Sequence, residues 1–184
     1  ANTLVGAGYS SRLNQEIRIR RGLTYGVGSS LDARRDGGLF AISAQTKNAS
    51  APELIEVTLA ELVRAADTAA PAPEVAARKL AVIGAVSRRF ETTEGLAGVI
   101  AGYEAYGIDV GEVTKVIDRL DAVTADEVRA FVAAHWPAAR FSIVVAGEAP
   151  QFAEALRAKY PQLVVIPQAD VDLERANLLR GGAR

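Results

Sequence analysis

Residues 24–47 constrain the fold most, because two strand-like runs are separated there by a short polar turn. The first run covers residues 24–33 and the second covers residues 39–47, with Arg-Arg-Asp-Gly-Gly between them. This composition favours a β-hairpin whose turn residues adopt positive φ values. The sequence therefore predicts at least one antiparallel pair of strands.

Most of the remaining chain carries a helical pattern. After Pro52 the hydrophobic period changes from two to about 3.6, which predicts a series of helices, with Leu80 on the inner face of the second one. A capping box at 124–127 begins a later helix. Two more strand-like runs cover residues 141–146 and 163–166. This segregation of strands and helices indicates an α+β fold, with a mostly antiparallel sheet and helices packed on one face.

Composition excludes several functional classes. The chain has 184 residues, 49% of them hydrophobic, and 21 Lys+Arg balance 22 Asp+Glu. This length suits one domain with a sizeable core, and the balanced charge gives no global attraction to nucleic acid or to an anionic membrane. No run reaches the roughly 18 to 20 apolar residues of a membrane helix, so we expect no membrane insertion. Any basic binding site must be local.

The chain is poor in metal ligands and nucleophiles. It has no cysteine and one histidine, so a thiolate metal cage and a thiol nucleophile are excluded. His135 stands beside Trp136 at an expected helix end, where a structural role is favoured over metal or proton chemistry. A metallopeptidase zinc motif needs two histidines. We therefore expect no metal site and no catalytic residue in this chain alone.

The glycine turn at Gly6-x-Gly8 resembles a phosphate-binding turn only superficially. No strand-like run precedes it, and no acidic residue follows about 20 positions later at the end of a second strand, so the dinucleotide fingerprint fails. A structural turn is the favoured interpretation.

A locally basic segment lies between residues 12 and 35. It contains six arginines against only Glu16 and Asp32. A solvated helix face and a charged hairpin tip account for most of these arginines. Arg18, with the nearby Tyr25, is the exception. The six are Arg12, Arg18, Arg20, Arg21, Arg34 and Arg35.

The run GAGYSSRLNQEIRIRRGLTYG at residues 6–26, followed by GLFAISAQT at 38–46, closely resembles the non-catalytic domain of bacterial M16 zinc peptidases. These peptidases are relatives of the mitochondrial processing peptidase and of insulin-degrading enzyme. The segments at 89–92, 120–124 and 144–147 follow in the order that the family shows. The resemblance therefore covers nearly the whole chain.

The resemblance implies a division of labour between two domains. In the family, an active domain carries the zinc motif His-x-x-Glu-His, and a sister domain of the same fold lacks it and faces it across a chamber. This chain matches the sister domain, so zinc is expected in the partner domain or subunit. Arg18 and Tyr25 match an Arg and a Tyr, seven residues apart, that the sister domain supplies. Their donors are expected to bind substrate carbonyls and to assist the transition state.

The resemblance thus implies the non-catalytic half of a bipartite zinc metallopeptidase. Its expected partners are a zinc-motif-bearing M16 subunit or domain and unfolded peptide substrates, with pairing of an extended peptide to a hairpin edge. Whether residues 28–33 form such an edge is left open by the sequence. Residues 1–167 are expected to form an inactive-type domain that lacks its first strands, and residues 168–184 a C-terminal tail. The expected compartment is the periplasm, with the cytoplasm as the alternative.

Two other functions stay open at this stage. One is a catalytically dead scaffold subunit of a larger assembly, like the core proteins of respiratory complexes. The other is a peptide-binding module without an enzymatic partner.

Overall fold

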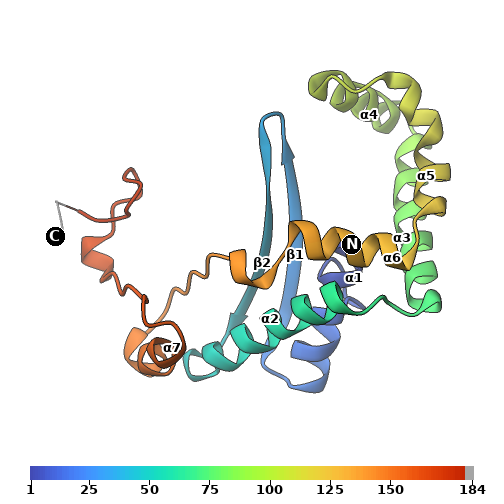
Figure 1. Ribbon diagram of the computed structural model, residues 1–184. Coiled ribbons are helices and arrows are strands. Elements are labelled where there is room, and N and C mark those ends of the chain that lie inside the picture. Colours follow the sequence, from blue (N-terminus) through green and yellow to red (C-terminus); the bar gives the residue numbers. More distant parts are fainter. Residues whose placement is uncertain (181–184) are drawn as a thin grey trace.

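The computed structural model describes residues 1–180. A long β-hairpin rises from a base of helices, an arm of helices extends on one side of it, and the C-terminal segment extends on the other (Figure 1). The described residues contain helices and one two-stranded antiparallel sheet. The predicted α+β class is therefore confirmed.

The N-terminal part forms two short helices and then enters the hairpin. Helix α1 (Asn2–Val5) ends at Gly6, and a π-helical segment, η1 (Asn14–Arg20), follows. Gly22, with φ of +64°, reverses the chain after η1. The N–H of Leu23 donates to the carbonyl of Ile17 (3.0 Å), which holds the entry of the next strand against η1.

The hairpin consists of β1 (Thr24–Arg34) and β2 (Gly37–Thr46). Its existence was predicted correctly, but the expected positive φ values were wrong, because no residue of 34–38 is among the described residues with positive φ. Gly38 instead pairs with Ala33 inside the ladder. A Cβ at Gly38 would lie 2.9 Å from the carbonyl oxygen of Asp32, so the glycine is needed for space rather than for its backbone angle.

Helices follow the hairpin, as the change of period after Pro52 predicted. The Thr124 capping box is present, and Gly107 ends a helix with φ of +66°. The elements are η2 (Asn48–Ser50), α2 (Ala51–Asp67), α3 (Ala72–Phe90), α4 (Thr93–Tyr106), η3 (Val110–Lys115), α5 (Val116–Ala122), α6 (Ala125–His135), η4 (Ala138–Arg140), η5 (Ala149–Gln151), α7 (Ala153–Lys159) and η6 (Gln168–Asp170). We call α3, α4, η3 and α5 the helical arm.

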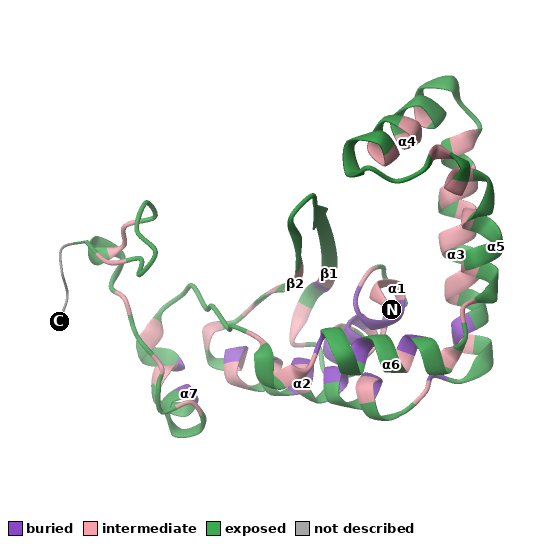
Figure 2. Cartoon of the chain, turned by 45° about the horizontal axis from the view of Figure 1, so that its top comes forward, coloured by how far each residue is buried: buried purple, intermediate pink, exposed green. Residues whose placement is uncertain are grey.

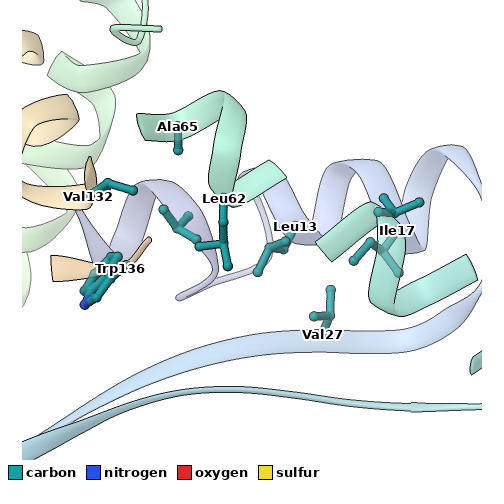
Figure 3. Close-up of a cluster of buried hydrophobic side chains, with 9 residues drawn as sticks. Leu13, Ile17, Val27, Leu62, Ala65, Val132 and Trp136 are labelled. Carbon is teal, nitrogen blue, oxygen red and sulfur yellow. The ribbon is translucent and has the colours of Figure 1, made fainter. Parts of the chain in front are cut away.

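The main core lies where η1, α2 and α6 meet one face of the hairpin (Figure 3). On β2, Phe40, Ile42 and Ala44 pack against this core, whereas the alternate residues Leu39 and Ser43 are exposed. This alternation places helices on one face of the sheet, as predicted. The fully or nearly fully buried members include Leu13 just before η1, Ile17 of η1, Leu62 and Ala65 of α2, Val132 of α6 and Trp136 just after it.

Three local predictions were wrong. Residues 141–146 and 163–166 are not strands, because within residues 1–180 neither run has a neighbouring strand with which to form a ladder. Leu80 is 71% exposed rather than inward-facing.

The helical arm carries few buried residues, and most of the burial lies around α1, α2 and α6 (Figure 2). Among the described helices, none has both the length and the apolar character that crossing a bilayer requires.

Candidate functional site

Arg18 lies on η1, within the corner at residues 17–25 where η1 passes into β1. Its guanidinium carbon is 4.8 Å from the centroid of the Tyr9 ring, a cation–π distance. Arg18 is half-buried, and Tyr9 is 61% exposed. Within residues 1–180, the structure gives Arg18 no carboxylate partner.

The neighbouring arginines are engaged elsewhere. Burial acts to raise the pKa of Glu16, but hydrogen bonds from Arg20 and Arg21 outweigh it and lower that pKa. Glu16 therefore stays ionised and occupied at neutral pH, and does not neutralise Arg18. The pairs in this region are Arg12 with Glu74, Arg20 and Arg21 with Glu16, Arg21 with Glu53, and Arg34 with Asp32.

Tyr25 lies in a β-bulge at the base of the hairpin. The register shifts between Thr24 and Val27, so that Tyr25 and Gly26 lie opposite Gln45. The hydroxyl of Thr24 donates to the carbonyl of Gln45 (2.6 Å) and accepts the N–H of Gly26 (3.0 Å). Bulges commonly redirect a side chain, and here Tyr25 is 97% exposed. Its phenol is therefore available to an external acceptor.

The two predicted residues share one corner but do not form a pair with each other. Within the described residues, no hydrogen bond or stacking contact joins Arg18 to Tyr25, and the aromatic ring that Arg18 contacts is that of Tyr9. Sequence reasoning missed Tyr9, although it lies inside the matching run at residues 6–26. No spacing rule connects positions 9 and 18, because the contact depends on how the loop before η1 folds back.

The outer edge of β1 is only partly open. Alternate residues of an antiparallel strand direct their N–H and C=O groups away from the paired strand. The outward N–H of Ser29 donates to the carbonyl of Gly6 (3.1 Å), and the outward carbonyl of Ala33 accepts the hydroxyl of Tyr106 (2.7 Å). Leu31, between them, has no such backbone partner among the described residues. Residues 28–33 therefore form an edge, occupied at two points and open at Leu31.

Gly6 has a spatial role at this edge. A Cβ at Gly6 would lie 2.5 Å from Ser29 Oγ, so a larger residue would push the turn away from β1. The hydroxyl of Ser29 also donates to the side-chain oxygen of Asn2 (2.5 Å). The glycine turn thus packs on the strand, in agreement with the structural interpretation of Gly6-x-Gly8.

A concave feature lies on the opposite edge of the hairpin. A groove of about 370 Å³ runs between β2, α2 and residues 141–146. Its lining is mainly apolar and includes Phe40, Leu59 and Ile143, with Lys47 as its ionisable residue. The groove therefore offers mainly packing surface, with Lys47 at its lining.

The residues present do not fit a zinc site. Among residues 1–180, no three His, Cys, Asp or Glu side chains gather closely enough to hold a metal ion. The single imidazole, His135, lies 4.5 Å from the Phe131 ring between centroids. Residues 1–180 therefore do not provide a set of side chains that would hold a zinc ion.

Comparisons with known sequences show a similarity to one family over the first part of the chain. The family model described as the peptidase M16 inactive domain matches residues 1–81. An uncharacterised zinc protease of Streptomyces coelicolor is 32% identical over 129 residues, which are 70% of this chain and 28% of that protein. An uncharacterised zinc protease of Mycobacterium tuberculosis is 28% identical over 146 residues, which are 79% of this chain and 33% of that protein. The chain thus spans about a third or less of these relatives.

Solved structures show the same fold. A peptidase M16 inactive domain from Pseudomonas fluorescens matches with a TM-score of 0.68 and 21% identity, over 74% of this chain and 33% of that one. A protease from Helicobacter pylori matches with a TM-score of 0.64 and 20% identity, over 72% and 32%. A chain of complex III from Candida albicans matches with a TM-score of 0.57 and 16% identity, over 68% and 30%.

Proposed function

We propose that this chain, whose residues 1–81 match the model of the peptidase M16 inactive domain, is the non-catalytic half of a bipartite zinc metallopeptidase. The proposed partner is an M16 domain or subunit with the zinc motif, on the same polypeptide or on another. The proposed substrates are extended peptides. One observation carries the proposal. The guanidinium of Arg18 has no carboxylate partner among residues 1–180, and it lies at the same corner as the exposed phenol of Tyr25.

Arg18 and Tyr25 suit the binding of peptide carbonyls. The guanidinium has five N–H donors in its plane, and its carbon lies 4.8 Å from the centroid of the Tyr9 ring. The phenol of Tyr25 can donate a hydrogen bond, and its exposure lets a substrate approach without displacing protein contacts. Together they provide one charged and one neutral donor for oxygen atoms of a bound peptide.

The edge of β1 suits recognition of the peptide main chain. Backbone pairing at an edge strand gives affinity without demanding particular side chains. Leu31 offers an open position for such pairing, and Tyr106 would have to release the carbonyl of Ala33 for the pairing to extend toward the hairpin tip. This mode of binding fits a peptidase that accepts varied unfolded peptides.

Peptide-bond cleavage is assigned to the partner, since the described residues of this chain do not form a metal site. This chain contributes donors that orient the substrate and stabilise negative charge developing on the carbonyl oxygen. Removing one such donor typically costs on the order of 3 kcal/mol of transition-state stabilisation, or about 100-fold in rate.

The proposal is tested on the assembled enzyme with a long unstructured peptide. Arg18→Ala and Tyr25→Phe are each expected to lower kcat/KM by about 10- to 100-fold, with little change in melting temperature. Arg20→Ala is the matched control, because Arg20 lies on the same helix but pairs with Glu16, and it should change kcat/KM less than about 2-fold. Unchanged turnover in both Arg18→Ala and Tyr25→Phe would remove this assignment.

The alternative is a scaffold subunit without catalysis, and the shared fold with a complex III chain makes it worth testing. Mixing this chain with a co-encoded zinc-motif partner separates the two functions. Peptide cleavage that requires both chains supports the metallopeptidase. A stable assembly that cleaves no peptide supports the scaffold.

A further inference from the structure

The contact between Arg18 and Tyr9 is an unusual way to hold an arginine. Elsewhere in this segment, the guanidinium groups of Arg12, Arg20 and Arg21 are held by carboxylates, which use their N–H donors. The guanidinium carbon of Arg18 instead lies over an aromatic ring, 4.8 Å from its centroid. Stacking orients the plane of the guanidinium while leaving its in-plane donors free.

The loop that carries Tyr9 is held in place by hydrogen bonds from two side chains. The side-chain amide of Asn14, which is only 6% exposed, donates to the carbonyl of Tyr9 (3.0 Å). One residue further along, the carbonyl and hydroxyl of Ser10 accept hydrogen bonds from Arg78 of α3. The loop that carries the ring is therefore attached both to η1 and to the helical arm.

The Tyr9 ring contributes little to the core. Tyr9 is 61% exposed and is not a member of the buried hydrophobic clusters. A buried aromatic would be expected to support folding, but a ring this exposed has mainly its contact with Arg18 to explain its position. Truncation of the ring should therefore affect Arg18 more than it affects stability.

We infer that Tyr9 is a positioning residue, which holds the Arg18 guanidinium by stacking so that its N–H donors stay available to carbonyl oxygens of an extended peptide. This inference rests on the proposed function. Arg18 has a long, flexible side chain, and without the ring it would sample several rotamers and lose part of its binding contribution. Exposed cation–π contacts are weak, so the expected loss is about 2- to 5-fold in peptide affinity.

The test is a double-mutant cycle in the assembled enzyme, with kcat and KM measured for the same unstructured peptide. Tyr9→Ala is expected to raise KM about 2- to 5-fold with a smaller change in kcat. Tyr9→Phe keeps the ring and should restore KM to within about 2-fold of the parent. In the Arg18→Ala background, Tyr9→Ala should have no further effect, because the residue acts through Arg18.

The outcomes separate this inference from the proposed function. If Arg18→Ala lowers turnover but Tyr9→Ala leaves KM unchanged, the inference is overturned and the proposed function stands. If Tyr9→Ala raises KM equally with and without Arg18, Tyr9 acts directly and the positioning role is wrong. If Arg18→Ala itself has no effect, both fail together. Urea unfolding of Tyr9→Ala, expected within about 0.5 kcal/mol of the parent, checks that a change in KM is not a folding defect.

Discussion

Arg12→Ala removes the ion pair that fastens the loop before η1 to the start of α3. Nε and Nη2 of Arg12 donate to Oε1 and Oε2 of Glu74, at 3.0 and 2.9 Å. The two side chains are 12% and 25% exposed, whereas those of the hairpin pair Arg34 and Asp32 are 72% and 54% exposed. Arg34→Ala is therefore a matched control, with the same kind of pair in a solvated place.

The expected cost follows from this difference in exposure. Hydrogen bonds between charged groups contribute about 1.5 to 3 kcal/mol when they are shielded, and water would satisfy part of the Glu74 carboxylate after truncation. We expect Arg12→Ala to lower the free energy of unfolding by about 2 kcal/mol, or roughly 4 to 8 °C in Tm for a chain of this size. Arg34→Ala should cost about 0 to 0.5 kcal/mol.

The effect of Arg12→Ala should depend on pH. The hydrogen bond from Arg12 lowers the pKa of Glu74, against an opposing effect of burial. Since the folded-state pKa lies below the unfolded value of about 4.3, the stabilisation is complete above that value and is lost as pH falls through the folded-state pKa. The stability gap between the parent and Arg12→Ala should therefore narrow at acidic pH.

Urea unfolding at pH 7 and at about pH 3 measures both effects, with unchanged m-values as the check that the unfolded state is the same. The reasoning is refuted if Arg12→Ala costs no more than Arg34→Ala at pH 7. It is also refuted if the full gap persists at the lower pH.

Two other measurements test features away from this pair. The isolated chain should bind no stoichiometric zinc, and elemental analysis that finds one tightly bound zinc per chain would contradict the assignment of the metal to a partner. Tyr106→Phe removes the hydrogen bond to the carbonyl of Ala33, so amide hydrogens at the hairpin tip should exchange about 2- to 10-fold faster. Unchanged exchange, equal to that of a Tyr103→Phe control, would mean that this contact does not hold the tip.

Local patterns predicted the elements whose cause is local. The hairpin, the helical period that follows it and the Thr124 capping box each depend on residues close in sequence, and all three appear in the structure. The strand predicted at residues 141–146 also had a strand-like apolar pattern, but a strand needs a neighbour as well. Its residues border a groove beside β2 instead of pairing with it. The prediction that Leu80 faces inward was wrong for a similar reason. An apolar stripe on a helix does not determine whether another element will cover it.

The candidate site divides in the same way. Arg18 and Tyr25 are predicted by the resemblance of residues 6–26 to a family, and the glycine turn between them is enough to place both at one corner. Neither the bulge that exposes Tyr25 nor the ring that covers Arg18 was predicted. The bulge arises from the pairing of β1 with β2, and the stack arises from the path of the loop that Asn14 and Arg78 hold.

The amino-acid sequence alone indicated the resemblance to the M16 inactive domain, the α+β class and the lack of thiol chemistry, because these depend on which residues are present and on their short-range order. The tertiary structure decided which cations remain free. Among the basic residues between positions 12 and 35, Arg12 is paired with Glu74 of α3, whereas Arg18 lies against the ring of Tyr9. These contacts join residues from different parts of the fold, so the local sequence does not distinguish the two arginines. Pairing depends on distance in space, and distance in space is set by packing.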